Sequence, residues 1–258
     1  MAARVKHNSA RGKSLGQNFL TDETLLDRLA EASGVTDGDD VLEIGAGLGG
    51  LTAALARRAK SVTAVEIDGS LEPGLRAAAS RFGNVKVLII DGMKLDWAKW
   101  IGESGGSVKF VSNLPYYITT PLLIRAFRMD PPFAGIAFMA QEEAAQRLLA
   151  EPGGEGYGPL SVWARVRFEP RAAIAVPSIM FSPPPDVDSQ FVTCAELADP
   201  VVKPEDYARF GRIVDAAFAS RRKTLYNNLR AAFGMSVDQT KAILNKAGLD
   251  ERVRAEDA

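Results

Sequence analysis

Cysteine and histidine each occur only once in the 258-residue chain, as Cys194 and His7. A single cysteine excludes an intrachain disulfide and is typical of a reducing compartment, so we expect the protein to act in the cytoplasm. These two residues are too few for a Cys/His zinc site, and we expect no bound metal. Catalytic triads built on a histidine base are disfavoured for the same reason.

Long apolar runs are also missing, because no stretch approaches the roughly 18 apolar residues that a membrane-spanning helix needs. The N-terminal segment is basic but lacks the apolar core of a signal peptide, so neither export nor membrane attachment is expected.

A net excess of one charge is missing too, since the formal net charge is −1. This total does not indicate a nucleic-acid binder, but phosphate affinity depends on local patches rather than on the total. Basic residues cluster near the N-terminus and in one C-terminal stretch: Arg4, Lys6, Arg11 and Lys13, then Arg221, Arg222, Lys223 and Arg230. Each cluster is consistent with an RNA contact or with an ordinary solvated surface.

Short apolar runs alternate with helical patterns along the first part of the chain. The runs cover residues 40–45, 61–67, 85–90, 108–114 and 135–140. Such alternation predicts an α/β fold, in which helices cover both faces of a mostly parallel sheet. An amphipathic helix is expected before the first run, with Thr21 or Asp22 as its N-cap and Gly34 after its end.

The remaining sequence divides into a glycine-rich break, further strands and a helical end. Residues 151–159 are expected to form a mobile surface loop, and strand-like segments follow at 167–176 and 190–195. The pattern is helical from about Pro204 onward. We therefore expect a larger α/β domain over residues 1–200 and a small all-α C-terminal domain over residues 201–258.

The first run leads into a glycine-rich turn and a helix, VLEIGAGLGGLT. Gly45, Gly47 and Gly49 allow a tight turn and a close approach of the backbone to a ligand. Because Gly45, Gly47 and Gly50 satisfy G-x-G-x-x-G, the turn alone does not separate a dinucleotide from S-adenosylmethionine, and a turn without a ligand also remains open.

Three acidic residues near the ends of consecutive predicted strands favour S-adenosylmethionine. Glu66 is placed to accept the ribose hydroxyls, and Asp91 to accept a hydrogen bond from an adenine amine. Glu43 lies inside an apolar strand, where a carboxylate is costly unless a nearby group needs it. A cationic cofactor provides such a need, whereas an anionic pyrophosphate would be repelled. Capping of neighbouring loops is the alternative reading of each acid.

The fourth predicted strand ends in the rigid tetrapeptide Asn113-Leu114-Pro115-Tyr116. The Asn113 side-chain oxygen and the Leu114 carbonyl are two acceptors that suit the hydrogens of an adenine amine, and Tyr116 offers a ring on which a flipped base stacks. No strong general base is needed, so orientation of the amine is the main expected contribution. A simple turn is the alternative.

Six motifs occur in an order that resembles the ribosomal RNA adenine N6,N6-dimethyltransferases, in particular the bacterial small-subunit (kasugamycin-sensitivity) dimethyltransferase family. They are GQNFL, LEIGAGLGGLT, VEID, NLPYYITTP, FSPPPDVDS and RRKTLYNNL, and the resemblance extends from about Leu15 to the end. It implies a Rossmann-like S-adenosylmethionine-dependent methyltransferase sheet with a helical C-terminal domain.

The resemblance also implies roles for individual residues. Together with the residue-based argument, it gives this expected cofactor set: Asn18, Leu20, Glu43, Gly45, Gly47, Glu66, Asp91, Met93 and Asn113. The target-amine set is Asn113, Leu114 and Tyr116, and Phe181 is similar to a second aromatic wall around the flipped adenine. Arg221, Arg222, Lys223 and Arg230 would contact RNA on a basic helix of the C-terminal domain.

By resemblance, the substrate is a pair of adjacent adenosines in the hairpin near the 3′ end of small-subunit rRNA, each of which receives two methyl groups. The implied partner is the immature small ribosomal subunit, and nothing in the sequence demands more than a monomer.

Two positions depart from the family pattern. Glu142 stands where relatives often have Lys, and Pro159 stands where they often have Arg. Both lose positive charge, so we expect weaker or different RNA docking near residues 140–160. The chain also stops where relatives usually continue for a short helix.

Three other functions remain as alternatives. A large-subunit rRNA adenine methyltransferase that confers resistance resembles this chain less at PPPDVDS and in the terminal helices. A ribosome-assembly factor would bind immature subunits mainly without catalysis, which the complete Asn113–Tyr116 set disfavours. An NAD-dependent dehydrogenase is disfavoured by Glu43 and by the lack of a proton-relay residue.

Overall fold

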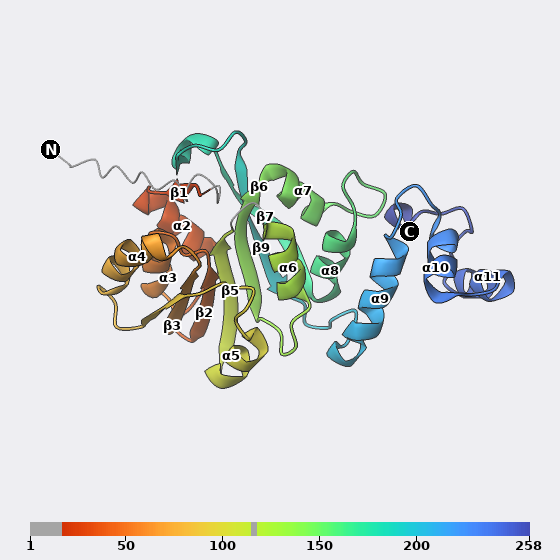
Figure 1. Cartoon of the computed structure of the whole chain (residues 1–258), viewed down its shortest axis with the longest axis horizontal. Helices are drawn as coiled ribbons and strands as arrows, with labels where there is room; N and C mark the ends of the chain where they lie inside the picture. Colours follow the sequence, from red (N-terminus) through yellow and green to blue (C-terminus); the bar gives the residue numbers. More distant parts are fainter. Residues whose placement is uncertain (1–16, 115–117) are drawn as a thin grey trace. The chain divides into compact units, whose positions relative to one another are not determined.

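The computed structural model describes residues 17–114 and 118–258 (Figure 1). Its contacts divide the chain into two compact units. The first contains the residues up to Ala145 together with Arg171–Cys194, and the second contains Gln146–Pro170 and Ala195–Ala258. The N-terminal basic cluster lies outside the described residues.

The main sheet has seven strands in the order β4-β3-β2-β5-β6-β9-β7. Neighbours are parallel from β4 through β6. Strands β3 and β4 lie on one side of β2, and β5 and β6 lie on the other, so the chain crosses over between β4 and β5. This is the predicted Rossmann-like arrangement, in which ligands bind where the strand order reverses. The bounds are β2 (Asp39–Ile44), β3 (Ser61–Glu66), β4 (Val85–Ile89), β5 (Ser107–Asn113), β6 (Gly135–Gln141), β7 (Phe168–Val176) and β9 (Ser189–Glu196).

Helices alternate with these strands, as the α/β pattern predicted. They are α2 (Glu23–Ala32), α3 (Gly50–Ala56), α4 (Glu72–Ala79), α5 (Trp97–Ser104), α6 (Thr119–Phe127) and α7 (Glu142–Leu149). At the start of α2 the Asp22 carboxylate accepts a 2.8 Å hydrogen bond from Leu25 N, and Gly34 follows the end with a φ of 67°. Asp22 is thus the N-cap, as one of the two predicted alternatives.

Adjacent residues of β5 face opposite sides of the sheet, as the two-residue period of a strand requires. Val111 packs in a buried cluster with Leu29 of α2 and Leu55 of α3. Phe110 instead contacts the ring of Trp97 at the start of α5, with a centroid distance of 5.6 Å. Helices therefore cover both faces, and α6 lies in front of the strands in Figure 1.

The second unit contains α8 (Pro159–Arg167), α9 (Tyr207–Ala217), α10 (Leu225–Phe233) and α11 (Val237–Lys246). Leu225, Leu229 and Leu244 form the centre of its small apolar core. Thr224 caps α10, and Ser236 with Gln239 forms a capping box at α11. The helical C-terminal end is therefore as predicted, but helices α5 and α8 were not predicted.

Two features of the second unit differ from the domain expectation. The chain enters this unit for the last time near Ala195, close to the predicted boundary at 200, but residues 146–170 also belong to it. Within that segment the glycine-rich stretch is restrained, because Gly153 N donates a 2.7 Å hydrogen bond to Glu256 O and Arg165 pairs with Glu151 at 2.6 Å. The limits of independent domains stay a prediction.

No helix within the described ranges is long and apolar enough to cross a membrane. Those same ranges also contain no group of three or more His, Cys, Asp and Glu residues that could hold a metal ion.

Candidate active site

A pocket of about 790 Å³, its open mouth included, lies where β2, β3 and β5 end. Four separate stretches of chain contribute its lining: Gln17, Asn18, Phe19, Leu20, Leu26, Glu43, Gly45, Ala46, Gly47, Leu48, Gly50, Leu51, Glu66, Ile67, Asn113 and Leu114. Seven of the predicted cofactor residues are therefore brought together, namely Asn18, Leu20, Glu43, Gly45, Gly47, Glu66 and Asn113.

The glycine-rich turn forms one wall of the pocket. Gly45, Gly47 and Gly49 have φ values of 79°, 58° and 84°, a region that side chains rarely adopt. A Cβ on Gly47 would lie 3.1 Å from the Phe19 ring, and one on Gly49 would lie 2.8 Å from the Ala78 Cβ. Close packing therefore requires glycine at Gly49, whereas the crowding at Gly47 comes from a residue that itself lines the pocket.

Glu66 is buried at the end of β3, with 4% of its surface exposed. Its carboxylate accepts 2.8 Å hydrogen bonds from the backbone N–H groups of Gly47, Ile67 and Asp68. The side chain therefore braces the glycine-rich turn against β3. Glu66 thus caps a neighbouring loop, which was the alternative reading of this residue. A contact with the cofactor ribose stays a prediction and would be an additional role.

Glu43 is also buried, with an exposure of 1%, and it accepts a 2.6 Å hydrogen bond from the Thr52 hydroxyl. Burial raises the pKa of this carboxyl to about 8; the Thr52 hydrogen bond opposes the rise and the nearby Glu66 adds to it. Glu43 is therefore mostly protonated at neutral pH while no cation is near.

The lining of the pocket suits a cationic ligand better than a phosphate. Glu43, Glu66 and Asn113 present oxygen atoms to it, and no Lys or Arg is among its described lining residues. An anionic pyrophosphate would meet two carboxyl groups without a compensating charge, whereas the ammonium and sulfonium groups of S-adenosylmethionine would meet acceptors. The residues present therefore fit this cofactor.

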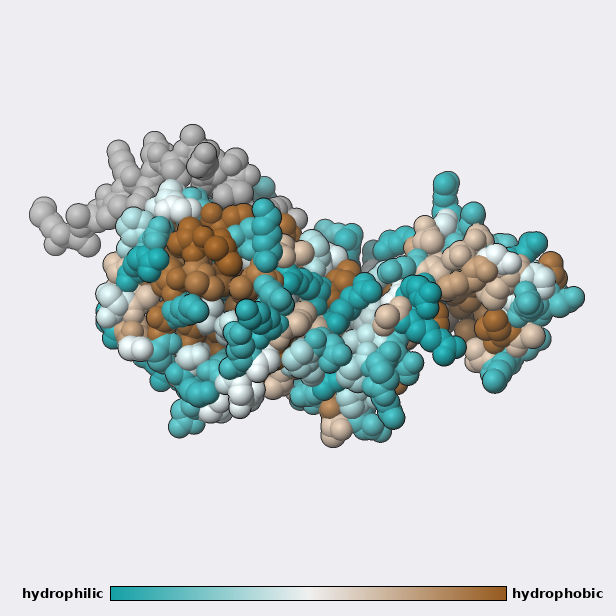
Figure 2. Space-filling view, turned by 60° about the horizontal axis from the view of Figure 1, so that its bottom comes forward, coloured by the Kyte–Doolittle hydropathy of each residue, from teal (hydrophilic) through white to brown (hydrophobic). Residues whose placement is uncertain are grey.

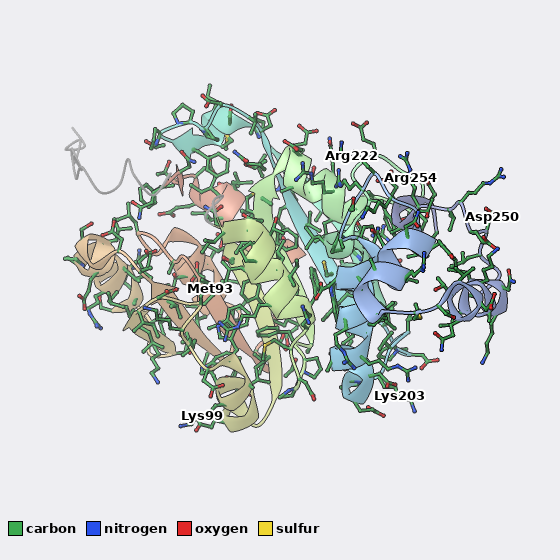
Figure 3. All side chains as sticks on the ribbon, turned by 45° about the vertical axis from the view of Figure 1, so that its right-hand side comes forward. Met93, Lys99, Lys203, Arg222, Asp250 and Arg254 are labelled. Atoms are coloured by element: carbon green, nitrogen blue, oxygen red, sulfur yellow. The ribbon has the colours of Figure 1, made fainter. Side chains whose placement is uncertain are left out.

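Asp91 and Met93 lie on the loop between β4 and α5 and do not line this pocket. The Asp91 carboxylate accepts a 2.9 Å hydrogen bond from Met93 N, and the Met93 side chain, labelled in Figure 3, is 39% exposed. Ile67 and Ile90 are exposed beside the same strand ends, at 49% and 39%. Figure 2 shows that the sheet-containing unit carries an apolar surface area next to polar ones.

Two of the residues that sequence reasoning missed in this region are informative. Ile67 lines the pocket, and its signal is an apolar residue placed directly after Glu66. Arg125 of α6 donates hydrogen bonds to carbonyl groups of the loop that carries Met93. Its signal is a single charge inside the apolar pattern TPLLIRAF.

The described part of the target tetrapeptide lies at the pocket. Asn113 is the last residue of β5, and its side-chain Nδ2 donates a 3.5 Å hydrogen bond to the carbonyl of Asn18. Leu114 N donates to Met139 O at 3.2 Å, which fixes the backbone beyond the strand. Tyr116 lies outside the described residues.

Phe181 is positioned by a two-stranded sheet formed by β1 (Phe19–Leu20) and β8 (Phe181–Ser182), in which Leu20 pairs with Phe181. Its side chain is only 4% exposed and belongs to the same apolar cluster as Val111. The ring packs into the core in this structure, and its role as a second aromatic wall around the adenine stays a prediction.

The predicted RNA-binding residues are exposed in the second unit, but three of them are not on a helix. Helix α10 begins at Leu225, because the Thr224 side chain accepts a hydrogen bond from Asn227 N and ends the preceding turn. The expected basic helix is corrected accordingly: Arg221, Arg222 and Lys223 lie in the turn before α10, and Arg230 lies on it. Arg222 is labelled in Figure 3.

A family model described as ribosomal RNA adenine dimethylase matches residues 8–257. The chain belongs to this family. It is therefore an S-adenosylmethionine-dependent rRNA adenine dimethyltransferase, as the order of its motifs predicted. The match extends through both units and includes the glycine-rich turn, the Asn113 segment and the terminal helices.

Curated relatives agree with this assignment. The dimethylase is 42% identical over 250 residues to the ribosomal RNA small subunit methyltransferase A of Lactiplantibacillus plantarum, covering 95% of this chain and 84% of that protein. It is 39% identical over 261 residues to the protein of the same name from Streptococcus pneumoniae, covering 99% and 90%.

Solved structures share the fold. A dimethyladenosine transferase from Plasmodium falciparum superimposes with a TM-score of 0.75 at 23% identity, covering 93% of this chain and 92% of the other. The 23S rRNA methyltransferase ErmE superimposes with a TM-score of 0.69 at 27% identity, covering 93% and 96%.

Proposed function

We propose that this dimethylase transfers methyl groups from S-adenosylmethionine to N6 of two adjacent adenosines in the hairpin near the 3′ end of small-subunit rRNA. The observation that carries this proposal is that Asn113 and Leu114 line the same pocket as Glu43 and Glu66. Acceptors for an amine and acceptors for a cationic cofactor therefore occupy one cavity. The small-subunit name of the relatives from L. plantarum and S. pneumoniae supports the choice of rRNA.

The chemistry asks the protein mainly to orient the amine. The cofactor supplies an electrophilic methyl group. An adenine amine is a poor nucleophile because its lone pair is delocalised into the ring, so two acceptors that bind its hydrogens favour a tetrahedral nitrogen. The Asn113 side chain donates through Nδ2 to Asn18 O, which leaves its Oδ1 as the acceptor for the amine. The Leu114 carbonyl is the second acceptor, and the Leu114 N–Met139 O hydrogen bond fixes the backbone on the N-terminal side of this residue.

The helical unit is proposed to contact RNA through Arg221, Arg222, Lys223 and Arg230. The partner in this proposal is the immature small subunit, approached by a monomer in the cytoplasm. A preformed ribosomal surface as substrate is compatible with the net charge of −1, because a few exposed cations suffice to contact phosphates.

The test is methyl transfer from labelled cofactor to undermethylated small and large ribosomal subunits, followed by mass spectrometry of the rRNA. We expect dimethyladenosine in small-subunit rRNA, at two neighbouring positions, and none when S-adenosylhomocysteine replaces the cofactor. Label in large-subunit rRNA would instead support a resistance methyltransferase. Tight subunit binding without transfer would support an assembly factor that acts without catalysis.

A further inference from the structure

Arg125 of α6 makes three hydrogen bonds to one short loop of the sheet-containing unit. Its Nη1 donates to Met93 O at 2.6 Å and to Gly92 O at 3.4 Å, and its Nη2 donates to Leu95 O at 2.6 Å. The loop is the connection from β4 to α5, which carries Asp91 and Met93. The guanidinium group thus donates to three backbone carbonyls of this loop.

Trp97 also donates a hydrogen bond to this loop. Its Nε1 donates a 2.9 Å hydrogen bond to Gly92 O, and its ring lies 4.1 Å from the Arg125 guanidinium carbon. Trp97 itself is completely buried against Phe110 and Phe133. The guanidinium therefore rests on a fixed aromatic face, an arrangement that favours Arg over Lys.

The loop has little freedom at Gly92. A Cβ at this position would lie 2.7 Å from Ile44 Cγ2, so the backbone packs directly against the end of β2. Beyond it, the Asp91 carboxylate is oriented by its hydrogen bond from Met93 N. Gly92 O and Met93 N belong to one peptide group, so the hydrogen bonds that Arg125 and Trp97 donate to Gly92 O also hold the N–H that orients Asp91.

The helix that carries Arg125 begins at Thr119, five residues after Leu114 of the target-amine segment. The Arg125 contacts therefore connect that helix with the loop predicted to hold the adenine of the cofactor. We infer that Arg125 is a positioning residue that holds Asp91 and Met93 in place for the cofactor's adenosine part, an inference that rests on the proposed function.

A positioning role differs from a purely structural one in what its loss changes. Three hydrogen bonds to one loop order that loop, so removing them should raise amide exchange locally and weaken ligands that touch it. General destabilisation would raise exchange throughout the unit. Burial lowers the pKa of Arg125, and the carboxylates of Asp96 and Asp91 oppose this lowering.

The experiment compares Arg125→Met and Arg125→Lys with the wild-type chain and with Arg76→Met. Arg76 is a matched control, because it also lies on a helix but pairs with the Glu72 carboxylate of its own helix, α4, at 2.7 Å. Hydrogen exchange of residues 91–96 is measured without cofactor. Calorimetry then gives the affinity for S-adenosylmethionine and for 5′-methylthioadenosine, which carries only the adenosine part.

We expect Arg125→Met to speed exchange at residues 91–96 but not in α4, and to weaken both ligands by a similar factor of about tenfold or more. Arg125→Lys should fall between, since one ammonium replaces a two-pronged donor. Unchanged affinity and exchange in Arg125→Met would overturn the inference, as would a loss confined to S-adenosylmethionine. A wild-type chain that fails to bind S-adenosylmethionine would instead refute the proposed function, which separates the two failures.

Discussion

The hydroxyl of Thr52 donates a 2.6 Å hydrogen bond to a carboxyl oxygen of Glu43, which lines the pocket at the ends of β2, β3 and β5. Both side chains are essentially buried, at 0% and 1% exposure. The bond favours the ionised carboxylate, but burial is the larger effect and raises the pKa to about 8. Charge at Glu43 therefore depends on whether a cation occupies the pocket.

Cofactor affinity is expected to depend on pH through this group. A bound cation lowers the pKa of Glu43 below the value of about 8 that it has in the cofactor-free protein, so binding releases a proton at neutral pH. Affinity for S-adenosylmethionine should rise between pH 6 and 8, by at most about tenfold per pH unit, and level off above. Calorimetry in buffers of different ionisation enthalpy measures the released proton. Glu43→Gln should show no such release, and a wild-type affinity independent of pH would exclude this coupling.

The stability of the cofactor-free chain is expected to depend on pH in the opposite direction, falling as pH rises. The folded pKa of about 8 lies above the usual 4.5 of a glutamate, so the native state binds more protons between these values. This group's contribution to the free energy of unfolding is therefore fully present below about pH 4.5 and is lost as pH rises through 8, at no more than about 1.4 kcal/mol per pH unit.

Urea unfolding of wild type and Glu43→Gln between pH 5 and 8 measures this contribution. The wild-type free energy of unfolding should fall more steeply with pH than that of the variant. Parallel curves would mean that Glu43 is ionised in the cofactor-free protein.

Removal of the Glu66 carboxylate should reduce both cofactor binding and stability. The three backbone N–H groups that donate to the Glu66 carboxylate would lose this partner in Glu66→Ala. We expect a destabilisation of about 2 kcal/mol or more, because hydrogen bonds to charged groups are strong. A thermal melt beside calorimetry checks this, and Glu66→Gln should retain part of both properties. An unchanged melting temperature in Glu66→Ala would contradict the bracing role.

Reversal of the Arg221–Lys223 charges should weaken binding to the small subunit. Each phosphate contact that is lost lowers the slope of log affinity against log salt by roughly one. Lys203→Glu is the matched control, since exposed Lys203 precedes α9 whereas Arg222 follows it (Figure 3). Binding titrations over a range of salt concentrations give the slopes. An equal slope for wild type and the reversed variant would make the turn an ordinary surface.

The sheet was predictable because its strands are short apolar runs. The first helix was predictable because Asp22 and Gly34 mark its two ends. Helix α8 was missed because PLSVWARVR mixes branched and aromatic residues without a clear polar face. Helix α5 was missed because only Trp97 and Ile101 of it are buried, which leaves a short apolar repeat. The basic turn was mistaken for helix because its cap, Thr224, was not recognised.

The pocket residues that could be predicted are those whose residue type is unusual for their place in the sequence. Glu43 is an acid inside an apolar strand, and Asn113 ends a strand beside a rigid proline. Arg125 carries the same kind of signal, but its partners are backbone carbonyls, which no side-chain pattern reveals. Phe181 illustrates the reverse case, because motif similarity gave it a role, whereas the structure shows it paired with Leu20 and buried in the core.

The most direct test of the account is single-turnover methyl transfer by Asn113→Ala at saturating cofactor, with RNA affinity measured on the same preparation. The account predicts a fall in the transfer rate of about 10²-fold, the loss typical when one preorganised polar contact to a reacting group is removed, while RNA affinity stays within about threefold. A transfer rate equal to that of the wild type, or a matching loss of RNA affinity, would contradict the claim that Asn113 orients the target amine.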